Sequence, residues 1–251
     1  MENIHPLKTV ATIEARMTST RLPGKVLMPV MGKPMLEYMI ERVRRVPELD
    51  EIVVATTVND TDQPIVDLAE RLGISWFRGS ENDVMGRVLN AAQSYDADVI
   101  VELTGDCPLI DPDVISSVIR CFSQGEADYA SNVPIRTYPL GMETQVFPTS
   151  ILADAASLTQ DPSDREHVSL YIYSHPERYH IVTVDSGLPK RWHGIRLTLD
   201  TVEDFELIHE IFKTLYPSNP QFTLRDILAL LRSRPELLGL NPGLVRKPVR
   251  A

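Results

Sequence analysis

The chain has 251 residues, 43% of them hydrophobic and 24% charged, which is enough for a core without disulfides or metals. Its formal net charge of −10 excludes a general binder of nucleic acid or membrane surfaces, although a nucleotide needs only a local cluster of cations. No stretch approaches the ~20 apolar residues of a membrane span, and the first ten residues lack signal-peptide character. We therefore expect a cytoplasmic protein. The cysteines, Cys107 and Cys121, have no metal-ligand spacing.

Short β-rich runs alternate with helical stretches through the first half of the chain. The pattern predicts strands at residues 9–15, 51–57, 75–77 and 99–103, and helices at residues 34–46, 64–72, 84–95 and 113–122. Such βαβα order indicates an α/β fold with a mostly parallel, twisted sheet flanked by helices. Because such sheets bind ligands outside the carboxyl ends of their strands, the loops after the four strands should line one cleft.

The second half is less regular and is expected to add a small lobe. Its strands are predicted at residues 144–147, 179–184 and 195–199, and its helices at residues 150–158, 166–174, 202–215 and 227–231. Thr223 and Asp226 have the spacing of a capping box before the last helix. The sequence contains neither an internal repeat nor a linker.

The first candidate site is the loop of residues 15–25, ARMTSTRLPGK, which follows the first predicted strand. It holds three cations, three hydroxyls and one glycine, and these groups can neutralise and orient a triphosphate. The spacing of a Walker loop is absent. A solvated basic loop is the alternative, but the position after a strand of a parallel sheet favours nucleotide binding.

Two aspartates that follow apolar strands are candidate metal ligands. Asp106, in LTGDCPLID, and Asp200, in RLTLDTVED, stand where a parallel sheet opens its cleft, and their carboxylates suit a hard cation. We predict that they converge on one ion, although an ordinary turn aspartate is an equal alternative for each on sequence alone. Asp111 and Asp204 stand at helix-capping positions and are interpreted as structural.

Taken together, these segments resemble the nucleotide-sugar cytidylyltransferases of the acylneuraminate and spore coat polysaccharide type. The matching segments span about residues 9–215 and are ARMTSTRLPGKVL, GKPMLEYMIERV, IVVATT, FRGSENDVMGRVLNAA, LTGDCPLIDP, DREHVSLYIYSHPERY and RLTLDTVEDFELI. The resemblance implies a glycosyltransferase A-like, Rossmann-type nucleotide-binding sheet. It also implies transfer of CMP from CTP to an acidic sugar of the ulosonic or sialic type, with Mg²⁺ as cofactor and pyrophosphate released, for surface polysaccharide biosynthesis. A homodimer is implied as well.

The resemblance also assigns roles to particular residues. Arg16 and Lys25 would be catalytic residues that hold the triphosphate, and Asp106 and Asp200 would be catalytic as magnesium ligands. The other nucleotide-binding candidates are Ala15, Ser19, Arg21, Arg78, Ser80 and Arg87. The acceptor-binding candidates are Glu143, Gln145, Arg165, Glu166 and His167. The implied organisation is a single domain over residues 1–251, with a nucleotide-binding half at about 9–125, an acceptor-binding and dimerisation half at about 126–215, and a C-terminal helix and tail at about 216–251.

Two segments depart from the family pattern. Glu14 stands where this branch usually has glutamine, and residues 141–145, GMETQ, stand where it has a glycine and two acids. No side chain stands out as a general base; His167 is the best candidate, with acceptor binding or a structural role as alternatives. Another nucleotidyltransferase, a glycosyltransferase on the same sheet and a non-catalytic nucleotide-binding module are the alternative functions. The presence of both Asp106 and Asp200 favours an enzyme.

Overall fold

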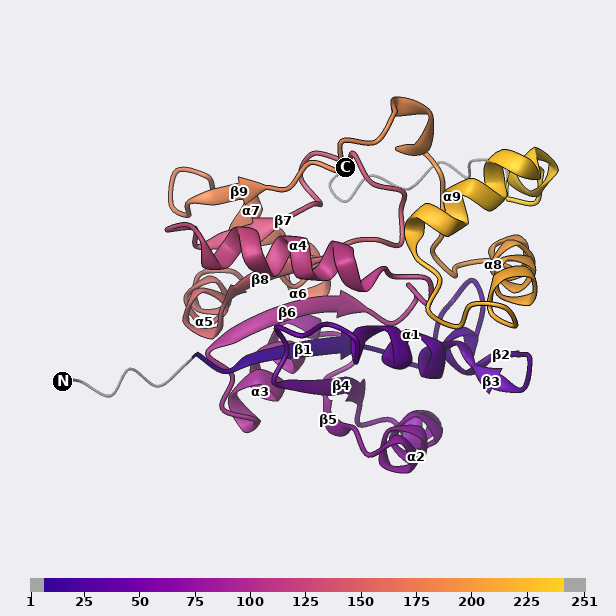
Figure 1. Ribbon diagram of the computed structural model, residues 1–251. Helices are drawn as coiled ribbons and strands as arrows, with labels where there is room; N and C mark the ends of the chain where they lie inside the picture. The colour runs from indigo at the N-terminus through magenta and orange to yellow at the C-terminus, as the bar shows by residue number, and fades with distance from the viewer. Residues whose placement is uncertain (1–6, 242–251) are drawn as a thin grey trace.

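The computed structural model describes residues 7–241; residues 1–6 and 242–251, which include the end of the expected C-terminal tail, lie outside the described residues. The centre of the molecule is a seven-stranded sheet with the strand order β5-β4-β1-β6-β8-β7-β9 (Figure 1). Helices flank the sheet on both faces. The predicted α/β fold with a mostly parallel sheet is therefore confirmed.

The first half of the chain builds the parallel part of the sheet. Its strands are β1 (Thr9–Glu14), β4 (Glu51–Thr57), β5 (Ser75–Gly79) and β6 (Val99–Thr104). These strands run parallel to their neighbours in the order β5-β4-β1-β6, so their carboxyl ends lie together at one edge. Their bounds agree with the predicted ones to within two residues, because strands buried on both faces carry long apolar runs.

The second half extends the same sheet with a change of direction. Strand β8 (Gln145–Pro148) is antiparallel to β6 and to β7 (Tyr129–Ser131), and β9 (Ile181–Thr183) is parallel to β7. Strand β7 was not predicted, because three residues are too few to show a period. A separate hairpin consists of β2 (Pro29–Val30) and β3 (Lys33–Pro34).

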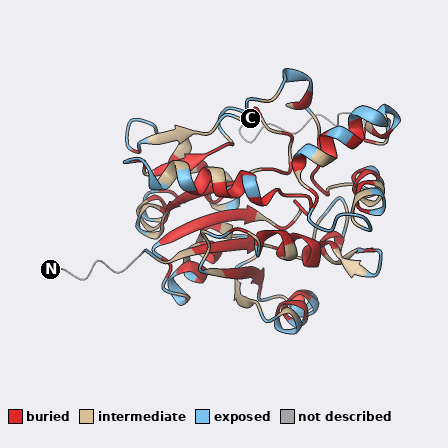
Figure 2. Ribbon diagram, in the orientation of Figure 1, coloured by how far each residue is buried: buried red, intermediate tan, exposed pale blue. Residues whose placement is uncertain are grey.

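Two helical layers enclose the sheet. One face packs against α1 (Met35–Val43), α2 (Gln63–Leu72) and α4 (Pro112–Ser123). The other face packs against α3 (Val84–Ser94), α5 (Thr149–Leu158) and α7 (Leu170–Ser174). These layers bury the central strands (Figure 2). Within residues 7–241, every helix is too short or too polar to span a bilayer.

A third apolar core forms the small additional lobe. Helices α8 (Val202–Leu215) and α9 (Leu224–Ser233) pack there with Val30 of the hairpin and lie to one side of the sheet (Figure 1). Both helices begin with a capping box, in which a threonine and the aspartate three residues later satisfy each other's backbone amides. The structural interpretation of Asp204 is therefore confirmed.

Two predicted elements are wrong. Residues 195–199 form no strand: Arg196 makes one isolated bridge with Leu140, and the Leu199 amide donates to the Asp106 carbonyl instead. The segment passes so near Gly141 that a Cβ there would lie 2.8 Å from the Leu197 carbonyl carbon, so a side chain at position 141 would clash with it. The predicted helix at residues 166–174 is divided into α6 (Pro162–Glu166) and α7, because Val168 has a φ of 43°, which a right-handed helix does not accept.

Candidate active site

The loop of residues 15–25 closes on itself after β1. The Gly24 amide donates to the Met17 carbonyl at 2.8 Å, and Gly24 takes a φ of 72°, a conformation that glycine adopts without steric strain. Its last residue, Lys25, begins the 3-10 helix η1 (Lys25–Leu27). The closed loop keeps its three cations beside the carboxyl edge of the sheet.

The Lys25 ammonium joins the two aspartates that were predicted to converge. Its Nζ atom lies 3.0 Å from Asp106 Oδ2 and 2.8 Å from Asp200 Oδ1. Arg21 Nη2 lies 2.7 Å from the same Asp200 oxygen. Two carboxylates and two cations, from segments far apart in sequence, therefore meet at this point of the edge.

Burial strengthens the charge interactions within this cluster. Lys25 is only 9% exposed, so the solvated-loop alternative does not describe it. Burial alone would lower the pKa of Lys25, but the Asp106 and Asp200 carboxylates outweigh it and raise that pKa. Burial alone would raise the pKa of Asp106, but Lys25 holds it below its usual value. Both groups are thus kept charged inside the protein.

Backbone contacts fix the two aspartates. The Asp106 carbonyl accepts the Leu199 amide at 2.7 Å, which ties the end of β6 to the segment before Asp200. Asp204 Oδ2 accepts the Asp200 amide at 3.0 Å, and Asp204 itself forms a buried ion pair with Arg196. Asp204 and Arg196 are therefore positioning residues for Asp200, and a capping box inside LDTVED is the signal that points to the first of them.

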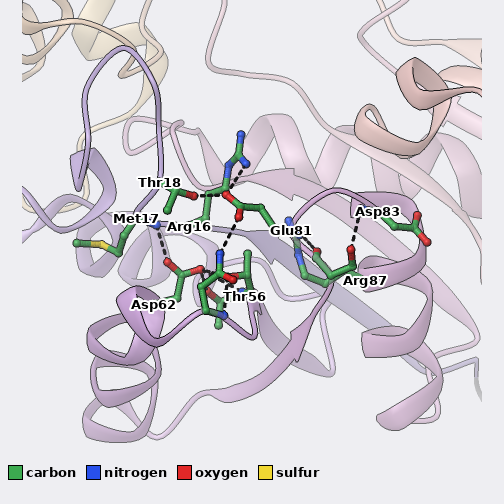
Figure 3. A network of polar contacts seen from close by, with 11 residues as sticks. Arg16, Met17, Thr18, Thr56, Asp62, Glu81, Asp83 and Arg87 are labelled. Carbon is green, nitrogen blue, oxygen red and sulfur yellow. Dashed lines mark hydrogen bonds and ion pairs between the residues drawn. The ribbon is translucent and has the colours of Figure 1, made fainter.

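A second carboxylate network surrounds Arg16 (Figure 3). Glu81 accepts hydrogen bonds from Arg16 Nη1 at 3.0 Å, from Thr18 Oγ1, and from Asn59 Nδ2 at 2.7 Å. The bonds from Thr18 and Asn59 lower the pKa of Glu81. Glu81 thus links the first loop to the loops after β4 and β5, a role that the sequence analysis missed although Glu81 lies inside the matching segment FRGSENDVMGRVLNAA.

A fully buried carboxylate anchors the start of the first loop. Asp62 Oδ1 accepts the Met17 amide at 2.8 Å, and Asp62 Oδ2 accepts the hydroxyls of Thr56 at 3.1 Å and Thr57 at 2.6 Å (Figure 3). Such a carboxylate, surrounded by donors, stabilises the loop in one conformation. The sequence analysis missed Asp62 because its donors lie on two separate segments.

The other nucleotide-binding candidates lie around this edge. Arg78 donates to the carbonyl of Thr57 at the end of β4 and to that of Asn59 in the loop after it. The buried Arg87 donates to one carbonyl of β4 and to the Ser80 carbonyl. The Ser80 hydroxyl accepts the amide three residues later. Ala15 is buried and Ser19 is half-buried. Arg78 and Arg87 therefore support loops in this structure, and their roles toward a nucleotide stay predictions.

The acceptor-binding candidates are more dispersed. Glu143 accepts an amide of its own turn at 2.5 Å, and Arg165 donates to carbonyls at the end of α5. Glu166 and His167 are exposed beside the strained Val168. The contacts of Glu143 and Arg165 hold the fold, and the roles of these residues, of Glu166 and of His167 toward an acceptor stay predictions.

Gln145, the fifth of these candidates, belongs to a buried polar group. Its Oε1 atom accepts the hydroxyls of Tyr129 at 2.8 Å and Ser169 at 2.7 Å. Gln145 pairs in register with Glu102 of β6, which is 3% exposed. Glu102 was not singled out from sequence, although one acid inside the apolar run VIVELT is an unusual choice for a buried strand.

Glu14 adds a second acid to this group. Burial raises the pKa of Glu14 to about 8, a rise that the Arg87 guanidinium opposes and the Asp106 carboxylate reinforces. Burial, and then Glu14 itself, hold the pKa of Glu102 well above its usual value. Both departures from the family pattern, Glu14 and Gln145, therefore lie in one buried polar group next to the Lys25 cluster.

Asp106 and Asp200 suit a divalent ion that also binds a nucleotide. Mg²⁺ is typically held by one or two carboxylates together with substrate phosphates. Among residues 7–241, no three His, Cys, Asp or Glu side chains are grouped to hold a metal by themselves. The two carboxylates therefore fit an ion whose coordination is completed by phosphate oxygens.

The fold and the site together define a class of protein. Three cations from one loop can neutralise a triphosphate, and two convergent carboxylates beside them can hold its metal, all at the ligand-binding edge of a parallel sheet. The chain is a nucleotidyltransferase enzyme.

Comparison with known proteins makes the assignment more specific. The chain belongs to the cytidylyltransferase family, whose model matches residues 10–227. An uncharacterized protein of Methanocaldococcus jannaschii, MJ1063, is 35% identical over 97% of this chain and 98% of its own length. The spore coat polysaccharide biosynthesis protein SpsF of Bacillus subtilis is 34% identical over 89% of this chain and 94% of its own. A 3-deoxy-manno-octulosonate cytidylyltransferase of Trichlorobacter lovleyi is 37% identical, but only over 46% of this chain and 45% of its own.

Solved structures share the fold. A cytidylyltransferase from Leptospira borgpetersenii superposes with a TM-score of 0.88 at 31% identity, covering 96% of this chain and 100% of that one. A CMP:2-keto-3-deoxy-manno-octonic acid synthetase, determined with CTP, superposes with a TM-score of 0.64 at 20% identity, covering 82% and 98%. The second likeness concerns the fold alone.

Proposed function

We propose that this chain transfers CMP from CTP to an acidic sugar of the ulosonic or sialic type and releases pyrophosphate. The observation that carries the proposal is the Lys25 ammonium between Asp106 and Asp200, at the edge where the first loop gathers its cations. The relative named as an octulosonate cytidylyltransferase supports a sugar acid as acceptor, and the relative named for spore coat polysaccharide supports a role in polysaccharide biosynthesis.

In this proposal the first loop receives the triphosphate. Arg16 and Arg21 exchange their carboxylate partners, Glu81 and Asp200, for phosphate oxygens, and Lys25 turns from the aspartates toward the pyrophosphate. The acceptor hydroxyl attacks the α-phosphorus and releases its proton to solvent, while the bond to pyrophosphate breaks. The cations neutralise the charge that grows on the leaving group. Positioning and charge neutralisation account for most of the rate enhancement.

Asp106 and Asp200 would hold Mg²⁺ in the complex with CTP. The ion would supply charge neutralisation and polarise the phosphate oxygens. Without it, the two carboxylates have Lys25 as their shared counter-ion, so binding of CTP and Mg²⁺ and reorientation of Lys25 should be linked.

The second half of the chain is proposed to bind the acceptor and to form a homodimer. Residues of about 126–215 supply the exposed Glu166 and His167 and the buried Gln145. Sedimentation equilibrium would test the dimer directly: a single species of 28.2 kDa at micromolar concentration would refute it.

A substrate panel tests the proposed function. Pyrophosphate release is measured for CTP, UTP, ATP and GTP with Mg²⁺, each with 3-deoxy-manno-octulosonate and with sialic acids. We expect release with CTP and at least one acid. Thermal shift provides a second readout, since a ligand at a hundred times its dissociation constant stabilises by ~2.7 kcal/mol. A larger shift with another triphosphate, or release without any acid dependence, would overturn the proposal.

A further inference from the structure

A cavity of about 270 Å³ lies between the end of α1 and the small additional lobe. Arg42 in the last turn of α1 and Arg45 just beyond it form one wall, and Phe212 and Tyr216 at the end of α8 form another. The described residues that line this cavity share no member with the Lys25 cluster. It is therefore separate from the candidate active site.

The two arginines of the wall carry buried donors that have no acceptor. Arg42 is 3% exposed, and neither its Nη2 atom nor the buried Nε atom of Arg45 has a hydrogen-bond partner among the described residues. Arg42 Nε donates to the Ile110 carbonyl at 2.6 Å, and the guanidinium carbon lies 4.5 Å from the centre of the Phe222 ring. These contacts hold Arg42 in place. Since buried polar groups are nearly always hydrogen-bonded, the remaining donors call for an acceptor.

The two guanidinium groups also repel one another. Burial, and then the charge of Arg45, lower the pKa of Arg42 to about 10. Asp111 and Asp226 oppose this lowering, but their carboxylates already accept backbone amides at the starts of α4 and α9. They act on Arg42 from a distance and satisfy none of its donors.

The acid that lines the cavity is also engaged elsewhere. Glu41 pairs with the Lys33 ammonium and accepts the Tyr216 hydroxyl at 3.0 Å. Among residues 7–241, the charges of Arg42 and Arg45 thus have no carboxylate paired with them. An anion from outside the chain would supply both the missing acceptors and the missing charge.

Charge and size decide which anion fits. A phosphoryl group carries about −1.5 to −2 charges at pH 7 and three strong acceptor oxygens, which match two guanidinium groups, whereas a carboxylate brings a single charge. A cavity of about 270 Å³ is several times the ~30 Å³ share of one water molecule, so it has room for a phosphoryl group with a small substituent.

We infer that this cavity binds a phosphoryl anion, either inorganic phosphate or the phosphate of a small monoester, through Arg42 and Arg45. The anion accepts hydrogen bonds from both guanidinium groups and replaces their mutual repulsion with attraction. The inference does not rest on the proposed transfer of CMP.

Titration calorimetry of the intact chain with inorganic phosphate, at constant ionic strength, tests the inference. We expect phosphate to bind at least about tenfold more tightly than acetate. Arg45→Gln should weaken the Kd for phosphate by about tenfold or more, as the loss of a charge-assisted hydrogen bond does. Arg44→Gln is the matched control: it removes the same charge one residue away, from an exposed side chain that donates to the Leu72 carbonyl, and should keep the wild-type Kd.

The same titrations with glucose 6-phosphate distinguish the two sources of the anion. Binding as tight as that of phosphate, and sensitive to Arg45→Gln, assigns the site to a monoester; binding of phosphate alone assigns it to the free ion. If Arg45→Gln does not fold, Arg45→Lys decides, because it keeps the charge but loses the planar fork of donors and should weaken phosphate binding by roughly threefold or more.

Three results would overturn the inference: no binding of phosphate at millimolar concentration, acetate as tight as phosphate, or equal Kd values for Arg44→Gln and Arg45→Gln. The last result would mean that phosphate binds elsewhere, such as at the first loop. Each of them leaves the proposed function standing, because CMP transfer is measured with other residues and other ligands.

Discussion

The proposed nucleotide side of the site and its proposed acceptor side differ in how their charged groups are paired. On the nucleotide side, Lys25, Arg21 and Arg16 already have carboxylate partners, so a triphosphate must exchange with them. On the proposed acceptor side, one carboxyl oxygen of Glu14 and one of Glu102 are buried and have no hydrogen-bond partner among the described residues. In the first region every loop cation is already paired without a ligand, so a triphosphate binds by taking the place of these carboxylates. The second region contains buried polar atoms that have no hydrogen-bond partner among the described residues.

The largest effect that separates the two regions is expected for Asp106→Asn. The amide keeps the shape but removes the charge that holds Lys25 and the proposed metal, so Mg²⁺-dependent pyrophosphate release should fall by about 10²–10³-fold, or ~2.7–4 kcal/mol. Asp200→Asn should behave alike, and the double variant should be little worse than either, since the two act as one unit. Additive losses in the double variant would show that the carboxylates act separately.

Lys25→Ala should affect both activity and stability. It removes a cation aimed at the triphosphate, at ~2–4 kcal/mol in activity. It also leaves Asp106 without its cation, and Asp200 with Arg21 alone. Breaking a fully buried pair costs ~3–5 kcal/mol, and partial exposure of Asp106 reduces this to roughly 1–3 kcal/mol of unfolding free energy. Mg²⁺ should therefore stabilise the variant more than the wild type in thermal unfolding. Equal shifts would contradict a shared site for lysine and metal.

Glu81→Gln should have a smaller effect that is confined to CTP. The amide can still accept from one donor but loses the ion pair with Arg16, so the loop is held less firmly. We expect KM for CTP to rise about tenfold, or ~1.4 kcal/mol, with little change in kcat. Steady-state kinetics with the acceptor saturating gives the two constants. A fall in kcat with KM unchanged would place Glu81 in the chemical step.

Sequence reasoning predicted the nucleotide side more completely than the acceptor side. The first loop and Asp106 follow strands whose apolar runs are unmistakable, and topology alone brings such segments to one edge. Asp106 and Asp200 converge without a strand at residues 195–199, because the Leu199 amide donates a hydrogen bond to the Asp106 carbonyl. The expected strand was wrong because an apolar alternation looks the same in an irregular buried segment.

The proposed acceptor side was harder to predict because several of its polar residues lie inside strands. Glu102 and Thr12 occupy positions that periodicity assigns to the core, and their registry with Gln145 depends on an antiparallel pairing that no turn signal announces. The break at Val168 was hidden because a β-branched residue rarely takes a positive φ. Single acids within apolar runs, at positions 14 and 102, were the available signal.

The smallest predicted effect is a change of stability with pH that has opposite signs for Glu14 and for the charge-paired Glu51. The pKa of Glu14 is raised to about 8 in the folded chain, above the 4.5 of an unperturbed glutamate, so the folded state holds its proton more tightly. Stability linked to Glu14 is therefore full below pH 4.5 and is lost as pH rises toward about 8. Glu14→Gln cannot ionise and should gain stability over the wild type across that interval, as urea midpoints at pH 5 and pH 8 would show.

Glu51→Gln is the control. Lys8, the partner of Glu51, helps to lower the pKa of Glu51, so the stability that the Glu51 carboxylate contributes is present at neutral pH and disappears on acidification. If both variants respond to pH with the same sign, then Glu14 is not a buried, protonated acid.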